Sequence, residues 1–249
     1  MPYHTEPASD AKTQRKLEIK KVKMTADSSK GFESVPDPLV QNGNWFMILI
    51  SPPGGGKTTL VKNLLTRKTL YGRRFDTCHY FSPSLSTVEI PLPKSRLHNE
   101  LNVSEIEQLI KNTEKGEHML LVLDDMVASL PGSNSEKLKP FLKLVFNRRH
   151  LCGPGGGVSI ILTAQKLSSI PRALRCASNM IVSFYTSNLK ELKTFWEEYS
   201  HVSWEDFLNM CAQAWSEKHS FLFGRLDRRE GDRRWFKNFT HHLVKQDAS

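Results

Sequence analysis

The chain has 249 residues, a formal net charge of +9 and 39% hydrophobic residues, which suits one sizeable domain with appendages or two small ones. The basic balance favours a polyanionic partner, nucleic acid before membrane. The longest apolar run, residues 45–50, is too short to span a bilayer, so no membrane insertion is expected. The four cysteines are dispersed without a C-x-x-C pair, which disfavours a zinc site and predicts reduced thiols in an intracellular protein.

Residues 1–34 predict a polar, basic and partly disordered N-terminal extension. Within it, residues 16–24 alternate weakly between apolar and polar side chains and could add an edge strand. The turn-rich residues 34–44 then lead into the first strongly apolar segment.

From Trp45 onwards, short apolar runs alternate with amphipathic segments, a rhythm that predicts strands alternating with helices. Buried strands are expected at residues 45–50, 76–83, 118–123, 158–165 and 179–185. Helices are expected at residues 56–67, 104–112, 136–150 and 203–218, with one more after Asn188. Residues 219–226 and 233–239 flank a turn-like segment and predict a hairpin. The predicted fold class is α/β, with a doubly wound, mainly parallel sheet, helices on both faces and a C-terminal β-hairpin.

Three of the predicted helices begin with capping signals. Ser104 with Glu107 matches a capping box, Asn188 with Glu191 forms a second one, and Ser203 opens the last helix. These residues mark where the chain is expected to turn into each helix.

Residues 51–59, SPPGGGKTT, nearly spell the phosphate-binding loop G-x-x-x-x-G-K-[ST] and lie between a predicted strand and a predicted helix. The glycines at 54–56 allow backbone N–H groups to turn toward phosphate oxygens, and the helix N-terminus adds positive potential. Lys57 is expected to reach the β- and γ-phosphates, Thr58 to bind Mg²⁺, and Thr59 to lie at the α-phosphate end. ATP and Mg²⁺ are therefore the expected cofactors.

The departure from the motif is Ser51, which stands where the first glycine is usual. A serine is tolerable there if its φ is negative, and Pro52 and Pro53 stiffen the turn without cost if their missing N–H groups are not needed. The residues expected to bind ATP are Ser51, Pro52, Pro53, Gly54, Gly55, Gly56, Lys57, Thr58 and Thr59.

A second glycine run, GPGGGVSI at residues 153–160, offers a comparison within the same chain. It lacks the Lys-Thr pair, and a strand follows it where the phosphate loop has a helix. It is therefore expected to be a flexible loop and not a second nucleotide site.

Polar residues end two of the buried strands. Asp124 and Asp125 follow residues 118–123, so Asp124 is expected to hold the Mg²⁺ hydration shell and Asp125 to polarise the attacking water as general base. Gln165 ends residues 158–165 and should reach the same sheet edge, where its amide can bond the γ-phosphate or the water. The alternatives are aspartates that cap a turn and a merely exposed glutamine.

Arg148 and Arg149 end the predicted helix 136–150. Cations are favoured at a helix C-terminus, so this position needs no function. The functional alternative is an arginine finger that reaches the nucleotide of a neighbouring subunit.

The motif order SPPGGGKTT, LLVLDD, NRRH, VSIILTAQ and IPRALR resembles that of viral genome-packaging ATPases of the poxvirus and giant-virus type, in the FtsK–HerA superfamily of P-loop NTPases, over roughly residues 35–240. The resemblance implies a RecA-like P-loop ATPase domain at 35–240 with a tail at 241–249. In that domain the strand ending in glutamine lies between the other two motif strands. It also implies a homo-oligomeric ring, expected to be a hexamer, that translocates double-stranded DNA.

The same resemblance implies capsid or portal-vertex proteins as partners, and a location at the virus assembly site of the host cell or in the virion. It implies roles for Lys57 and Thr58 in the loop, for Asp124 and Asp125 as the acidic pair, and for Gln165 as sensor. Arg149 falls at the finger position. Residues 152–156 look like an insertion that would shift Arg149 relative to Gln165, so Arg148 or Arg175 could act as the finger.

Two other functions remain open on the sequence. A nucleoside or nucleotide kinase also uses a phosphate loop, and a non-hydrolysing ATP-binding scaffold could recruit DNA and capsid partners. Basic groups that could contact DNA lie at Lys16–Lys23, Arg67–Arg74, Arg148–Arg149 and Arg228–Arg234, with the terminal hairpin and the N-terminal tail favoured.

Overall fold

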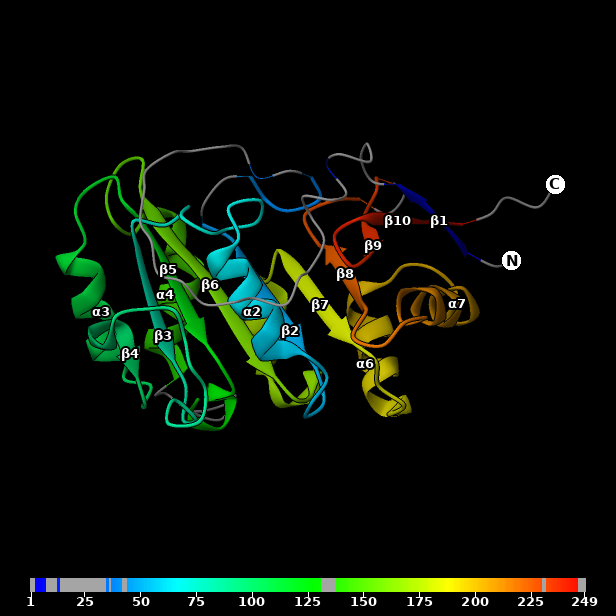
Figure 1. Ribbon diagram of the computed structural model, residues 1–249, viewed down its shortest axis with the longest axis horizontal. Coiled ribbons are helices and arrows are strands. Elements are labelled where there is room, and N and C mark those ends of the chain that lie inside the picture. The colour runs from blue at the N-terminus through cyan, green and yellow to red at the C-terminus, as the bar shows by residue number, and fades with distance from the viewer. Residues whose placement is uncertain are drawn as a thin grey trace.

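The computed structural model describes residues 3–7, 13, 35, 37–41, 44–130, 138–229 and 232–245. In this part of the chain, one sheet runs in the order β1-β10-β9-β8-β7-β2-β6-β5-β3-β4 (Figure 1). Its strands are β1 (Tyr3–Pro7), β2 (Phe46–Ile50), β3 (Thr77–Phe81), β4 (Leu97–His98), β5 (His118–Leu123), β6 (Gly157–Ala164), β7 (Met180–Phe184), β8 (Phe221–Arg225), β9 (Trp235–Lys237) and β10 (His241–Lys245).

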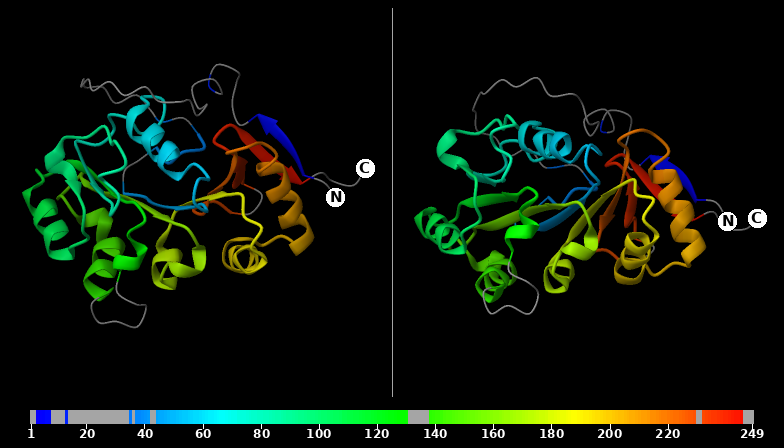
Figure 2. Two further views of the ribbon diagram at one scale, coloured as in Figure 1. Left: turned by 60° about the horizontal axis from the view of Figure 1, so that its bottom comes forward. Right: turned by 90° about the horizontal axis from the view of Figure 1, so that it is seen from below.

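Helices lie on both faces of this sheet (Figure 2). They are α2 (Lys57–Thr66), α3 (Val103–Asn112), α4 (Leu138–Asn147), α5 (Arg172–Ala177), α6 (Leu189–Tyr199) and α7 (Trp204–Ala214). Helix α2 covers one face with Leu60, Val61 and Leu64, and the remaining helices cover the other. The predicted α/β fold with helices on both faces is therefore confirmed. Within the described residues, no helix combines the length and apolar character needed to cross a membrane.

The parallel part of the sheet runs β7-β2-β6-β5-β3-β4. Strand β6 pairs on one side with β2, where Ala164 is opposite Ile50, and on the other with β5, where Leu162 is opposite Leu123. The strand that ends before Gln165 thus lies between the other two motif strands. The carboxyl ends of these strands meet at one edge, here called the carboxyl edge, and their starts form the amino edge.

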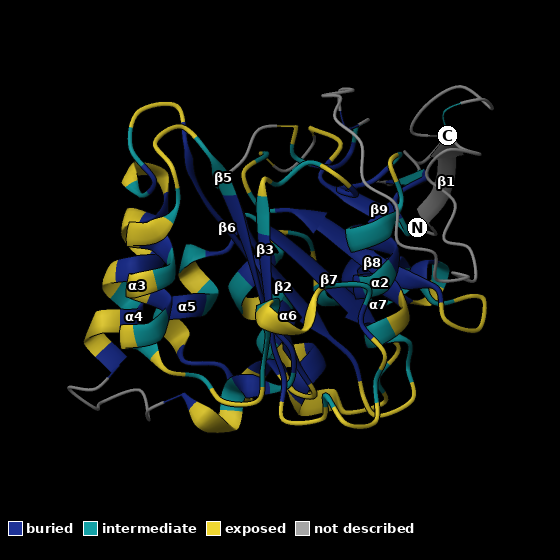
Figure 3. Cartoon of the chain, turned by 60° about the vertical axis from the view of Figure 1, so that its left-hand side comes forward, coloured by how far each residue is buried: buried dark blue, intermediate teal, exposed yellow. Residues whose placement is uncertain are grey.

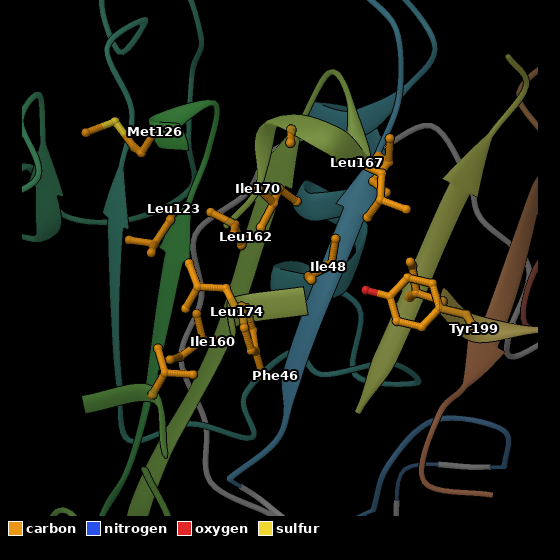
Figure 4. Close-up of a cluster of buried hydrophobic side chains, with 14 of the residues drawn as sticks. Phe46, Ile48, Leu123, Met126, Ile160, Leu162, Leu167, Ile170, Leu174 and Tyr199 are labelled. Carbon is orange, nitrogen blue, oxygen red and sulfur yellow. The ribbon is translucent and has the colours of Figure 1, made fainter. Parts of the chain in front are cut away.

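The continuous apolar runs of the sequence correspond to strands buried on both faces, as expected for a parallel sheet. All eight residues of β6 are buried, and Figure 3 shows the strands dark blue beneath helices with exposed outer sides. One core cluster packs Ile48 and Leu162 of the sheet near Leu174 of α5 (Figure 4). Each such fully buried aliphatic side chain contributes roughly 1.5–3 kcal/mol to folding.

Antiparallel strands extend the sheet beyond β7. The predicted terminal hairpin is confirmed, because β8 pairs with both β7 and β9 in antiparallel register. The sheet then continues through β10 to β1, in which Tyr3 lies opposite Lys245. The expected tail at 241–249 therefore begins inside the sheet, and the extension at 1–34 contains a strand at its start. The edge strand expected at 16–24 lies outside the described residues.

The helix starts agree with the predicted caps in two of three cases. The Asn188 side chain accepts hydrogen bonds from the first turn of α6, and Ser203 caps α7. Helix α3 is capped by Asn102, whose Oδ1 accepts from the N–H groups of Ser104 and Glu105, so the capping box expected at Ser104 is wrong. Asn102 has an extended backbone and lies directly before the helix, so its amide oxygen caps the first turn and the helix begins at Val103, earlier than expected.

Candidate nucleotide-binding site

The phosphate loop leaves the carboxyl end of β2 with Ser51 fully buried beneath it. The Ser51 N–H donates to Ala164 O at 3.1 Å, so the β2–β6 ladder continues one residue into the loop. The Ser51 hydroxyl donates to Pro52 O at 2.9 Å, and a Cβ on Gly55 would come within 2.1 Å of that hydroxyl oxygen. Because Ser51 does not have a positive φ, the condition for tolerating serine at this position is met.

The glycines give the loop its shape and leave the helix start open. Gly54 and Gly56 have φ values of 74° and 115°, in the left-handed region that favours glycine. Gly56 is also the N-cap of α2 and has no side chain with which to cap the first turn. The N–H groups that follow therefore have no side-chain acceptor at the cap, and together with the helix dipole they form an environment that suits phosphate oxygens.

Lys57 connects the loop to the acidic pair of β5. Its side chain is 8% exposed, and its Nζ donates to Asp125 Oδ1 at 2.8 Å and to Oδ2 at 3.1 Å. Asp125 has a left-handed backbone, with φ 53°, and its side chain is 37% exposed. The strand order has therefore brought together two of the predicted site residues that are far apart in the sequence.

Asp124 lies deeper than its neighbour, and its carboxylate is held from two strands. Tyr80 of β3 donates its hydroxyl to Oδ2 at 2.6 Å, and Thr163 of β6 donates its hydroxyl to Oδ1 at 2.6 Å. Thr163 Oγ1 also accepts from the N–H of Asp125 at 2.9 Å. Burial, and then the Asp124 carboxylate, raise the pKa of Tyr80, which keeps this hydroxyl a donor. Each carboxylate oxygen retains a lone pair for a metal-bound water.

Tyr80 and Thr163 were not among the predicted site residues. The signal available in the sequence was a side-chain hydroxyl within each apolar strand. That of Thr163 lies two residues before Gln165. A buried hydroxyl needs a hydrogen-bond partner, but only the strand order identifies that partner as Asp124.

Gln165 follows β6 at the carboxyl edge and is exposed there. The turn after it is anchored by Glu191 of α6, whose carboxylate accepts from Leu167 N–H at 2.6 Å and from the Ser168 hydroxyl at 2.5 Å. Glu191 was expected only to cap its own helix with Asn188. Its side chain instead fixes the segment that carries the predicted sensor.

The predicted arginines lie away from this edge and differ from one another. Arg148 is buried, and its guanidinium donates to Asn44 O at 3.0 Å, Val145 O at 2.8 Å and Asn179 Oδ1 at 2.7 Å. Burial lowers the pKa of Arg148 to about 10, which leaves it charged at neutral pH. Arg148 thus joins α4 to the starts of β2 and β7 inside its own chain and is not available as a finger.

Arg149 is exposed at the amino edge, one residue along from Arg148 in the short 3₁₀ turn Arg148–His150. Arg175, the other alternative, pairs with Glu198 Oε1 at 2.8 Å. The eight residues of β6 separate the amino edge from the carboxyl edge by roughly 25 Å. Arg149 therefore cannot reach the phosphate loop of its own chain.

The glycine-rich segment 152–156 forms a turn. Gly116 N–H donates to Cys152 O at 2.8 Å, and Gly157 N–H donates to Glu117 O at 3.1 Å. These bonds join the segment before β6 to the segment before β5. The second glycine run is thus joined to the segment before β5 by hydrogen bonds, and no helix N-terminus follows it.

Residues 47–188, more than half of the chain, match the ATPase family associated with various cellular activities (AAA). The chain belongs to this family. ATP binding is typical of AAA P-loop NTPases, and the loop after β2 in this AAA protein has the geometry for it. No curated protein sequence matches the chain.

Solved structures resemble this AAA protein at low sequence identity. The genome packaging NTPase B204 from Sulfolobus turreted icosahedral virus 2, in complex with ATP-gammaS, has a TM-score of 0.52 and 14% identity, over 82% of this chain and 98% of that chain. B204, the DNA-packaging ATPase from Sulfolobus turreted icosahedral virus, has a TM-score of 0.51 and 14% identity, over 83% of this chain and 100% of that chain. This likeness shows a shared α/β P-loop NTPase fold.

Proposed function

We propose that this AAA-family protein is an ATP-hydrolysing motor that translocates double-stranded DNA, packaging a viral genome into a capsid. The observation that carries the proposal is the meeting of Lys57 with the Asp124–Asp125 pair, beside the strand that ends before Gln165. The motif order resembles that of packaging ATPases of the poxvirus and giant-virus type in the FtsK–HerA superfamily. The fold likeness to B204, whose own description is DNA packaging, supports the same proposal.

The residues of the site divide the work of hydrolysis. The loop amides and Lys57 hold the triphosphate, and the three donors of the Lys57 ammonium allow it to serve phosphate oxygens as well as Asp125. Asp125 takes the proton of the water that attacks the γ-phosphorus, while the bond to the ADP oxygen breaks. Gln165 orients that water or the γ-phosphate. Thr58, and Asp124 through a water, would hold Mg²⁺, which would supply positive charge against the phosphates.

The carboxylates and hydroxyls present fit that metal. Asp124 is fixed by Tyr80 and Thr163 with lone pairs to spare, and oxygen ligands are those that Mg²⁺ prefers. Thr58 follows Lys57 in the first turn of α2, at the same edge. The contacts from Tyr80 and Thr163 fix the orientation of the Asp124 carboxylate. Asp125 is more exposed and can act on the attacking water.

Arg149 completes the site only from a neighbouring subunit, because it lies at the opposite edge of its own sheet. This placement supports a ring, expected to be a hexamer, in which each nucleotide lies between two subunits. Arg149→Ala should keep ATP binding and lose hydrolysis. Mixing it with Asp125→Ala should restore part of the activity, since some interfaces then combine an intact arginine with an intact aspartate.

DNA contacts are proposed along the amino edge, where exposed cations from separate segments gather. Three of them are Arg73, Arg229 and Arg233, on the turn after α2 and on the turn between β8 and β9. These exposed arginines would bind the phosphates of the DNA backbone, whatever the base sequence. The Lys16–Lys23 group lies outside the described residues. Capsid or portal-vertex partners, and a location at the virus assembly site or in the virion, belong to the same proposal.

The test is the ATPase rate of the full chain with and without double-stranded DNA, between about 50 mM and 200 mM salt, alongside the mass of the oligomer. DNA should stimulate turnover, and salt should suppress the stimulation steeply. Turnover indifferent to DNA would contradict a translocase. Phosphate transfer to a nucleoside would identify a kinase, and ATP binding without turnover a scaffold.

A further inference from the structure

The order of the strands gives a bound triphosphate a direction. Asp124 and Gln165, which are assigned to the γ-phosphate, follow β5 and β6 on one side of β2, while β7 and β8 lie on its other side. The phosphate loop itself follows β2. A triphosphate whose γ end points toward β5 and β6 must extend its nucleoside toward β7 and β8. This step rests on the proposed function.

A hollow lies on that side of the loop. It is lined by Pro52–Gly55 of the phosphate loop, by Phe184 and Tyr185 at the end of β7, and by Trp215–Ser220 before β8. Its volume is about 370 Å³, within the range of small-molecule sites. The hollow thus begins where the phosphates would end, and its size suits a nucleoside.

The far wall of the hollow is preformed and joined to the phosphate loop. His219 Nδ1 donates to Gly55 O at 3.2 Å, since a carbonyl can only accept. The Trp215 indole N–H donates to Ser183 O at 2.8 Å. Lys237 of β9 donates to the Ser216 hydroxyl at 2.8 Å and to Glu217 Oε1 at 2.5 Å. A ligand in this hollow would therefore meet a wall that needs little ordering.

Tyr185 provides an aromatic surface beside this wall. Its side chain is 62% exposed, although most large hydrophobic side chains of the described part are buried. Its ring is perpendicular to the ring of Trp215, at 88° with centroids 5.8 Å apart. A ring that is fixed by an edge contact and still exposed offers a face on which a planar base can stack.

We propose that the nucleoside of the bound triphosphate occupies this hollow, that its base stacks on Tyr185, and that the site discriminates little between purine bases. Three polar side chains of the wall already have partners within the protein, because Lys237 holds Ser216 and Glu217, and the Ser220 hydroxyl donates to Glu217 O at 2.7 Å. Stacking accepts every base. Strong discrimination requires hydrogen bonds to the base edge.

The experiment measures displacement of a fluorescent ATP analogue from the full chain, without DNA, by ATP, GTP and inorganic tripolyphosphate. ATP and GTP should bind within about 5-fold of each other. Tyr185→Ala should weaken both by about 10-fold, in the range of one lost base–aromatic stack, and should leave tripolyphosphate unchanged. Tyr185→Phe should restore the affinity. Phe146→Ala, which removes a 55% exposed aromatic from α4 at the other edge, is the matched control and should change nothing.

Three results would overturn the assignment. ATP binding more than about 100-fold tighter than GTP would mean that the base edge is read by hydrogen bonds. Unchanged nucleotide affinity in Tyr185→Ala would remove the stacking role. Equal losses for ATP and tripolyphosphate would mean that the variant disturbs the phosphate loop. The assay needs neither hydrolysis nor DNA, so a failed motor and a failed nucleoside site remain distinguishable.

Discussion

Two runs of three glycines lie next to the neighbouring strands β2 and β6, one after the end of β2 and the other at the start of β6. They are therefore at opposite edges of the same sheet. Gly54–Gly56 leads into α2 at the carboxyl edge, and Gly155–Gly157 leads into β6 at the amino edge. In the second run, Gly156 N–H donates to Gly153 O at 3.2 Å, and a Cβ on Gly157 would come within 1.7 Å of Asn44 Oδ1. The amides of Gly156 and Gly157 thus bond within the chain, and neighbouring atoms fill the space beside these two glycines.

The comparison teaches that glycine supplies backbone freedom and not phosphate binding. In the first run the Gly56 cap leaves the helix start open, and Lys57 follows at once. The amino edge instead concentrates structural contacts, as Arg148 shows, with Arg149 exposed beside it. The following predictions test this division between the edges, from the largest expected effect to the smallest.

Lys57→Ala should weaken ATP binding by at least about 100-fold, because charge-assisted hydrogen bonds to the phosphates are lost. Isothermal titration with ATP measures this loss. Lys115→Ala is the matched control, since Lys115 packs against Gly153 of the other glycine-rich segment, and it should bind ATP normally. Comparable losses of ATP affinity in both variants would contradict the assignment of ATP binding to the carboxyl edge alone.

Arg148→Ala should lower the free energy of unfolding by about 3 kcal/mol, because buried acceptors on Asn44, Val145 and Asn179 lose their donor. Arg149→Ala, at the exposed neighbouring position, should change it by less than about 0.5 kcal/mol. Urea unfolding of the two variants makes the measurement. Similar costs for both would show that Arg149 also has a structural role.

Gly156→Ala should cost roughly 2 kcal/mol of stability, since its Cβ would lie 2.5 Å from Glu117 O and 2.7 Å from Cys152 O. Its ATP affinity should be retained in the folded protein. Gly54→Ala meets no atom within 4 Å but has a φ of 74°, so about 1 kcal/mol of stability and some ATP affinity should be lost. A reversed order of the two effects on ATP affinity would contradict the assignment of the two runs.

Acid should lower the stability through the middle of β3, where His79 contacts His98 at 3.0 Å. Burial, then the nearby His98 and Arg96, lower the pKa of His79 to about 4 from 6.5. The folded state therefore stays neutral at His79 while the unfolded state takes up a proton, so stability falls as the pH drops from 6.5 toward 4. His79→Gln should flatten that slope in urea unfolding, and an unchanged slope in this variant would contradict the role of His79.

Much of the fold and the outline of the site could be predicted from the sequence, because its signals there are local. Apolar runs identified the parallel strands, and the adjacent residues Gly56, Lys57 and Thr58 identified the loop. Since parallel strands end at one edge, Gln165 was expected at the same edge as Asp124 and Lys57, and at that edge Lys57 contacts Asp125. The functional roles of these residues remain predictions.

The remaining features depend on contacts between distant segments. Tyr80 and Thr163 are ordinary strand residues until β3 and β6 are placed on either side of β5. Arg148 and Arg149 look alike in the sequence, and only the packing of α4 against the strand starts separates them. The helical capping box at Ser104 failed because Asn102, two residues earlier, supplied a competing acceptor.

The pairing of β1 with β10 has a consequence for the order of folding. Tyr3 lies opposite Lys245 and Pro7 opposite His241. Strand β1 therefore cannot pair until β10 has been synthesised. Contacts of such sequence separation form slowly, since a long loop must close first. On the ribosome, the β7–β2–β6–β5 core can form while β10 is still unmade, and the edge of the sheet that β1 and β10 complete closes only after β10 has emerged.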